Sequence, residues 1–173
     1  MTTYATATDI VNTALQELGL GVVNLNAAAA DATGYQMLGL LNALGEEVLR
    51  ANDWQRMENV MNFVGNGVDD SFPQVWSWNK YGIVSAGVYY QYRILQDRYA
   101  IFPVPSDGEE FALYYISKNW VSVHGDPFVV ADRVVYPDDV IGFDRRLMIT
   151  GLKLKFWAIK GMDTTVLQNE FNF

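Results

Sequence analysis

Two apolar stripes run along the segment between residues 137 and 163. If this segment is a helix, with about 100° per residue, apolar side chains line up in two rows about 120° apart. The first row is Val140, Phe143, Leu147, Leu154 and Ala158, and the second is Ile141, Met148, Leu152 and Ile159. The pattern predicts a long C-terminal helix whose first turn holds Asp138 and Asp139, where carboxylates complement the helix dipole.

The two stripes have two possible explanations, which the sequence leaves open. Either one stripe faces the protein's own core and the second faces a partner in an assembly, or the helix is packed between other elements of the same fold. Between the stripes lies a basic row, Arg146, Lys153 and Lys160, spaced seven residues apart and therefore on one helix face.

The N-terminal part predicts two further helices. Thr8 is a suitable cap for the first, and Gly19 is a suitable stop. Its apolar arc is Ile10, Val11, Ala14, Leu15 and Leu18. The second helix is expected from a cap at Asp31 to about Asn52. The C-terminal helix is the natural third member of this group.

The middle of the chain changes from helical to strand periodicity. Side chains alternate over 88–95, and two further strands are expected at 99–102 and 111–116, separated by the turn PVPSDGEE. These three strands would form a β-meander, and residues 57–64 are a candidate for another strand. Residues 65–87 and 119–136 are expected to be loops.

The expected fold class is therefore α+β: a helical bundle with an inserted small antiparallel β-meander. We expect a single domain over 1–173, with residues 1–56 and 137–173 as the helical body and 57–136 as the inserted β-rich part.

The composition narrows the possible partners. A net charge of −8 argues against general nucleic-acid binding, which requires clustered Lys and Arg. With no cysteine, disulfides and thiol catalysis are excluded. No apolar run is long enough for a bilayer, and the N-terminus has no basic region typical of a signal peptide. We therefore expect synthesis in a cytoplasm and no membrane partner.

No motif predicts an enzyme, a cofactor or a metal site. The single histidine, His124, lies in the turn-like sequence VHGDP, where a solvated residue is the more common explanation. The acidic pairs 69–70, 109–110 and 138–139 have structural explanations in turns and helix starts. Trp76 and Trp78, in the loop VWSWNKYG, are candidates for an interface anchor or for core filling.

Three segments, taken in order, resemble the head-to-tail adaptor proteins of tailed bacteriophages, the group that includes the podovirus tail tubular proteins A. The segments are TATDIVNTALQELGLGVVN with the later EEVLRANDW, the central RYAIFPVPSDGEEFALYYISKNWV, and the closing DDVIGFDRRLMITGLKLKFWAIKGMD. They follow one another in order over nearly the whole length of the chain, and none carries catalytic residues.

The resemblance implies a structural, non-enzymatic protein of the virion, assembled in the host cytoplasm. Copies would form a ring, expected to have twelve subunits, between the portal protein and the tail tube or nozzle protein. The ring would extend the channel through which double-stranded DNA passes without specific binding. The free subunit is expected to be a monomer that assembles on the portal.

Three sets of residues follow from this resemblance. The portal-docking candidates are Val166, Leu167, Phe171 and Phe173. The ring-contact candidates are the second stripe, Ile141, Met148, Leu152 and Ile159. Trp76 and Trp78 are the candidates for contact with the tail. Some members of that family carry longer C-terminal extensions than this chain.

Two other functions remain as alternatives. One is a different virion connector, such as a head-completion or tail-terminator subunit. The other is a cell-wall glycosidase, which would need two carboxylates facing each other across a cleft at about 5–10 Å.

Overall fold

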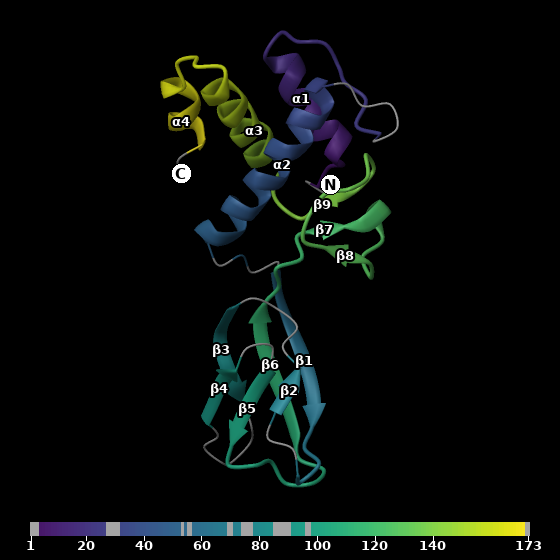
Figure 1. The fold of residues 1–173 in the computed structure, drawn as a ribbon, viewed down its shortest axis with the longest axis vertical. Coiled ribbons are helices and arrows are strands. Elements are labelled where there is room, and N and C mark those ends of the chain that lie inside the picture. The colour runs from purple at the N-terminus through teal and green to yellow at the C-terminus, as the bar shows by residue number, and fades with distance from the viewer. Residues whose placement is uncertain are drawn as a thin grey trace. The chain divides into compact units, whose positions relative to one another are not determined.

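The computed structural model describes residues 4–26, 32–52, 54, 57–68, 71–73, 78–84, 91–95 and 98–171. Its contacts divide the chain into two compact units. We call residues 1–52 and 119–173 the helical unit and residues 53–118 the β unit (Figure 1). The division assigns 119–136 to the helical unit, whereas the sequence pattern grouped these residues with the β-rich insertion.

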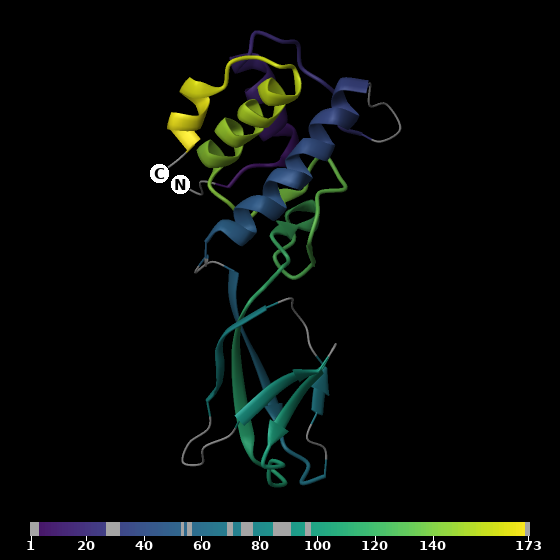
Figure 2. The same cartoon turned by 60° about the vertical axis from the view of Figure 1, so that its left-hand side comes forward.

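The helical unit contains α1 (Ala7–Glu17), α2 (Ala32–Ala51), α3 (Arg145–Ile159) and the short α4 (Thr165–Phe171). The central helix is α3, which packs against α1, α2 and α4 (Figures 1 and 2). Its middle turns are buried on nearly all sides, from Met148 to Lys153. Of the two explanations for the two apolar stripes, the structure confirms the helix packed within its own fold.

Both ends of α1 are set by local chemistry. The Thr6 hydroxyl oxygen accepts the Asp9 backbone N–H at 3.2 Å, so Thr6 is the N-cap, not Thr8. The Thr8 hydroxyl instead donates to the Pro137 carbonyl at 2.7 Å. Gly19 follows the helix with φ +73°, a conformation that glycine adopts without strain.

A small antiparallel sheet, in the order β8-β7-β9, completes the helical unit. Its strands are β7 (Val121–Ser122), β8 (Val130–Ala131) and β9 (Val140–Ile141), and a 3₁₀ turn, η2 (Val123–Gly125), follows β7. The start of the chain adds to β9, because the Ile141 N–H donates to the Ala5 carbonyl at 3.1 Å. Hydrogen bonding with residues remote in sequence thus makes 140–141 a strand.

The expected helix start at Asp138 and Asp139 is therefore wrong. The helix α3 begins at Arg145, and its N-cap is Asp144, whose carboxylate accepts the Leu147 N–H at 3.0 Å. In the core of the helical unit, Trp120 stacks on Phe143 with ring centroids 5.7 Å apart. The indole lies against Gly45 of α2, so close that a Cβ there would be 2.2 Å from it.

The β unit contains two three-stranded antiparallel sheets among its described residues. One has the order β1-β6-β3 and the other β2-β5-β4. The strands are β1 (Glu58–Val64), β2 (Ser71–Pro73), β3 (Trp78–Val84), β4 (Gln91–Leu95), β5 (Arg98–Phe102) and β6 (Glu110–Ile116). The expected class, α+β with helices and small antiparallel sheets, is confirmed.

The strand pairing differs from the expected meander at one point. β4 pairs with β5, but β6 pairs with β1 and β3. The connection before β6 is tied to the end of β1, since Gly65 donates to the Glu109 carbonyl and Gly108 donates to the Gly65 carbonyl, at 2.8 and 2.9 Å. These bonds place β6 beside β1. Two strands, β2 and β3, also lie in the segment expected to be a loop.

Candidate interaction surface

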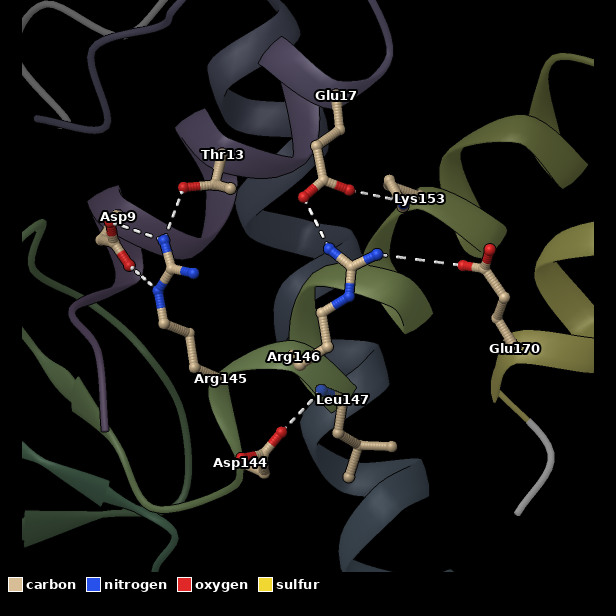
Figure 3. Close-up of polar contacts among 9 residues, drawn as sticks. All are labelled: Asp9, Thr13, Glu17, Asp144, Arg145, Arg146, Leu147, Lys153 and Glu170. Atoms are coloured by element: carbon tan, nitrogen blue, oxygen red, sulfur yellow. Dashed lines mark hydrogen bonds and ion pairs between the residues drawn. The ribbon is translucent and has the colours of Figure 1, made fainter. Parts of the chain in front are cut away.

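Two of the three cations in the basic row bind one carboxylate. Arg146 Nη1 and Lys153 Nζ donate to the two different oxygens of Glu17, each at 2.6 Å (Figure 3). The Lys153 side chain is only 8% exposed, while that of Glu17 is 32% exposed. A nearly buried ammonium requires such a partner, because an unpaired buried charge is costly. The pair therefore joins α3 to the end of α1.

The charge of Glu17 is stabilised by this arrangement. The hydrogen bond from Lys153 lowers the pKa of the Glu17 carboxyl, and Arg146 lowers it further, while burial opposes both effects. Arg146 also lies 4.0 Å from Glu170 of α4. The basic row thus has an internal electrostatic function over two of its three members.

A second ion pair between α1 and α3 was not expected from the sequence. Arg145 donates to both oxygens of Asp9, at 2.6 and 3.1 Å, and also to the Thr13 hydroxyl at 3.0 Å (Figure 3). The bond to Asp9 raises the pKa of the Arg145 guanidinium. The bidentate geometry fixes the helix orientation as well as the charge.

Lys160, the third member of the row, is exposed at the end of α3. Its ammonium lies 5.3 Å from the centroid of the Phe156 ring, within the range of a cation–π contact. Lys160 therefore makes a different contact from Arg146 and Lys153, which bind Glu17.

Three of the four ring-contact candidates must be corrected. Ile141, Met148 and Leu152 have no exposed surface and lie in the core of the helical unit. Met148 and Leu152 are buried because α3 is covered on several sides by the protein's own helices. Ile141 belongs to β9, which pairs with β7 and with the N-terminal segment. The fourth, Ile159, is 57% exposed and remains available to a partner.

The portal-docking candidates are divided in the same way. Leu167 is 7% exposed, and Phe171 is half-buried beside Gly151, where a Cβ would be 2.7 Å from the Phe171 ring. These two residues attach α4 to α3, so docking through them is not available in this structure. Val166 is 68% exposed. Phe173 lies outside the described residues.

The tail-side candidates are only partly within the described residues. Trp76 lies outside them. Trp78 is the first residue of β3 and pairs in register with Ile116 of β6. The backbone of Trp78 therefore belongs to a sheet and not to the expected surface loop.

An apolar groove of about 510 Å³ lies where α1 and α3 end. The loop after α1 and the last turn of α3 form its walls, and several of the lining side chains are substantially exposed: Leu20, Val22 and Met162 at 43%, 63% and 56%. Among the described residues that line it, Lys160 is the only charged one. A groove of this kind is suited to an apolar side chain from a partner.

His124, Asp138 and Asp139 form the one described cluster with the residue types of a metal site, with ligand atoms within 4.8 Å of one another. Asp139 is fully buried and accepts the backbone N–H groups of His124, Val135 and Tyr136 at 2.8 to 3.1 Å. Its oxygens are therefore already used in shaping the loop. This supports the structural explanation of the acidic pair over the two facing carboxylates of a glycosidase.

The exposed members of this cluster bind each other. His124 Nδ1 lies 2.9 Å from Asp138, and this hydrogen bond lowers the pKa of the Asp138 carboxyl. The imidazole also packs on Tyr136, with ring centroids 4.4 Å apart. His124 has φ +50°, an uncommon backbone conformation for a residue other than glycine. The hydrogen bonds of its backbone N–H to Asp139 and of its ring to Asp138 hold this conformation.

The chain matches no protein-family model and no curated protein. Within the described residues, no helix is both long and apolar enough to cross a bilayer.

The sequence pattern did not single out a group of exposed apolar side chains around Phe128. Phe128, in the loop between β7 and β8, is 92% exposed. Its neighbours Val129 and Val130 are 50% and 47% exposed. The signal was present in DPFVVAD, an apolar run flanked by acids in a segment read as irregular. Exposed apolar side chains grouped in this way are typical of binding surfaces.

Proposed function

We propose that this protein is a subunit of a head-to-tail adaptor ring in the virion of a tailed bacteriophage. In this role it joins the portal to the tail by its shape and surfaces, without catalysis. The ring, expected to have twelve copies, extends the channel for double-stranded DNA.

The observation that carries the proposal is where the adaptor-like segments lie. The first segment forms α1 and the end of α2, the central one forms β5, the following loop and β6, and the closing one forms β9 and α3. They therefore supply α1, α3 and the end of α2 in the helical unit. In the β unit they supply β6, the central strand between β1 and β3. A helical body interrupted by a separate β unit is the organisation that the resemblance implies.

The surfaces give further support. A ring subunit needs two different contact areas, because each copy meets its two neighbours through different faces. The helical unit carries an apolar groove and, separately, an exposed apolar loop. The net charge of −8 suits a protein that lets DNA pass without holding it.

Native mass spectrometry tests the proposal directly. The intact chain is measured alone and after mixing with the portal of the same phage. We expect a monomer alone, and a fixed number of copies on each portal in the mixture. Binding to a tail component without the portal would instead support a tail-terminator subunit. No assembly with either partner would refute the adaptor function.

The docking role of the C-terminus can be tested at Val166, which is exposed on α4. Val166→Asp should leave the fold intact and weaken portal binding at least tenfold. Removing residues 164–173 is a less selective test, because Leu167 and Phe171 pack onto α3. The matched control is Val68→Asp in the β unit, where Val68 is 80% exposed. Equal portal binding by the Val166 variant and the wild type would exclude α4 from the contact.

A further inference from the structure

The Phe128 loop, residues 123–129, is closed by its own hydrogen bonds although the Phe128 side chain is exposed to solvent. The Asp126 carboxylate accepts the Phe128 N–H at 2.9 Å, and the Asp126 carbonyl accepts the Val129 N–H at 3.3 Å. The Val123 N–H donates to the Val129 carbonyl at 2.8 Å and closes the loop. This turn presents an aromatic ring with little loss of backbone freedom on binding, as expected of an interface anchor.

The groove and the Phe128 loop cannot meet within one copy. The groove lies where α1 and α3 end, and the β8-β7-β9 sheet lies at the opposite end of the helical unit in both views (Figures 1 and 2). Both belong to one compact unit. Contact between them therefore requires a second copy of the chain.

The chemistry of the two surfaces is complementary. Leu20, Val22 and Met162 offer apolar surface to a ring, and Trp157 adds an aromatic wall. Lys160 is exposed at the groove, whereas the Phe128 loop carries Asp126, also exposed, two residues before the ring. A phenylalanine that enters the groove would bring this carboxylate close to the ammonium.

We propose that Phe128 of one copy inserts into the groove of the next copy, lined by Leu20, Val22, Phe156, Trp157, Lys160 and Met162. The contact is head-to-tail, because each copy contributes its loop on one side and its groove on the other. The inference deepens the proposed function by naming the subunit contact, and it rests on that function for the closure of the copies into a ring.

The absence of cysteine from the chain allows a selective test. Phe128→Cys and Val22→Cys are made as separate single variants, both at exposed positions. The two proteins are mixed and oxidised with copper phenanthroline, in which oxygen accepts the electrons as two thiols form a disulfide. Because the free protein is expected to be monomeric, this covalent trap also detects a weak contact. Circular dichroism at 222 nm verifies that each variant is folded.

The expected result is a disulfide dimer in the mixture, formed at least tenfold faster than in either variant alone. The matched control is Val68→Cys mixed with Val22→Cys, which should react only at the collision rate. Met162→Cys provides a second groove position if Val22→Cys folds poorly. A mixture no faster than the control, or equally fast pairing of Phe128→Cys with itself, overturns the head-to-tail contact.

A double variant carrying both cysteines separates this contact from the proposed function. Oxidation should give a ladder that ends at one closed species of fixed copy number. An open ladder without a limit would retain the contact but remove the ring. Portal binding by a chain that fails the mixing test would retain the adaptor function and remove this contact.

Discussion

Replacement of Glu17 should destabilise the helical unit by leaving a buried cation without its carboxylate. The proposed change is Glu17→Gln, which keeps the shape of the side chain and removes its charge. Lys153 is 8% exposed and cannot regain its hydration without moving. Removing one partner of a fully buried pair costs about 3–5 kcal/mol, and an exposed pair contributes about 0–1 kcal/mol.

The expected magnitude lies between these limits because Glu17 is one-third exposed and also binds Arg146. We expect a loss of about 2 kcal/mol in the free energy of unfolding. For a chain of this size that corresponds to a decrease of about 4–8 °C in Tm. Lys153→Met should cost less, below about 1 kcal/mol, since a methionine fits the buried stem without a charge.

The double variant Glu17→Gln/Lys153→Met tests the reasoning. Once the ammonium is gone, loss of the carboxylate no longer leaves a buried charge, so the two effects should not add. The assay is urea unfolding followed by circular dichroism at 222 nm, which reports the helices. Additivity of the two single changes to within about 0.3–0.5 kcal/mol would refute a direct coupling between these side chains.

The same pair predicts a pH dependence with a defined sign. The pKa of Glu17 is lowered from its ordinary value of 4.5 in the folded protein. Its contribution is therefore complete above about pH 4.5 and is lost as the pH falls through the lower, folded value. The stability difference between the wild type and Glu17→Gln should shrink over that acidic range. A difference that stays constant down to pH 2 would contradict the assignment.

The remaining predictions concern two of the three glycines of α2 and the loop before α3. Gly45→Ala should lower the free energy of unfolding by about 3 kcal/mol, because the new methyl group overlaps the indole of Trp120. Gly39→Ala, with open space at its Cβ, should raise it by about 0.5–1 kcal/mol. Urea unfolding compares the two variants. Asp139→Ala should cost about 3 kcal/mol because three backbone N–H groups lose a buried acceptor. Asp138→Asn is the exposed control and should unfold at the same urea concentration as the wild type. The Asp138 carboxyl, bonded to His124, should titrate below its ordinary 3.8 in a ¹³C NMR pH series, and His124→Ala should restore that value.

The sequence predicted the helices and strands best where the conformation of a segment is determined by the segment's own residues. The apolar arcs of α1 and α2 are local patterns, and both helices lie where periodicity placed them. The strands β1, β4, β5 and β6 also follow alternation or turn residues in their own segments. Local patterns were sufficient for these elements because their buried faces repeat with the period of the backbone.

The errors arose where partners remote in sequence decide the conformation. Val140 and Ile141 continue a helical pattern, but pairing with β7 and with the N-terminal segment makes them a strand. The buried Asp139 resembles a residue of a first helical turn and instead accepts N–H groups from a loop. Glu17 reaches Lys153 across 136 residues of sequence. No local rule identifies such a pair, so the site was predicted only in part.

The positions where the chain enters and leaves the β unit allow this unit to be replaced as a whole. β1 and β6 run antiparallel with Glu58 opposite Ile116, and the Ser117 N–H donates to the Met57 carbonyl at 2.7 Å. The polypeptide therefore enters and leaves this unit at neighbouring points. A few residues can bridge such a short gap. Recombination or design can therefore replace the β unit with a different domain without adding residues to the helical unit. Changes in the β unit can then accumulate separately from changes in the helical unit.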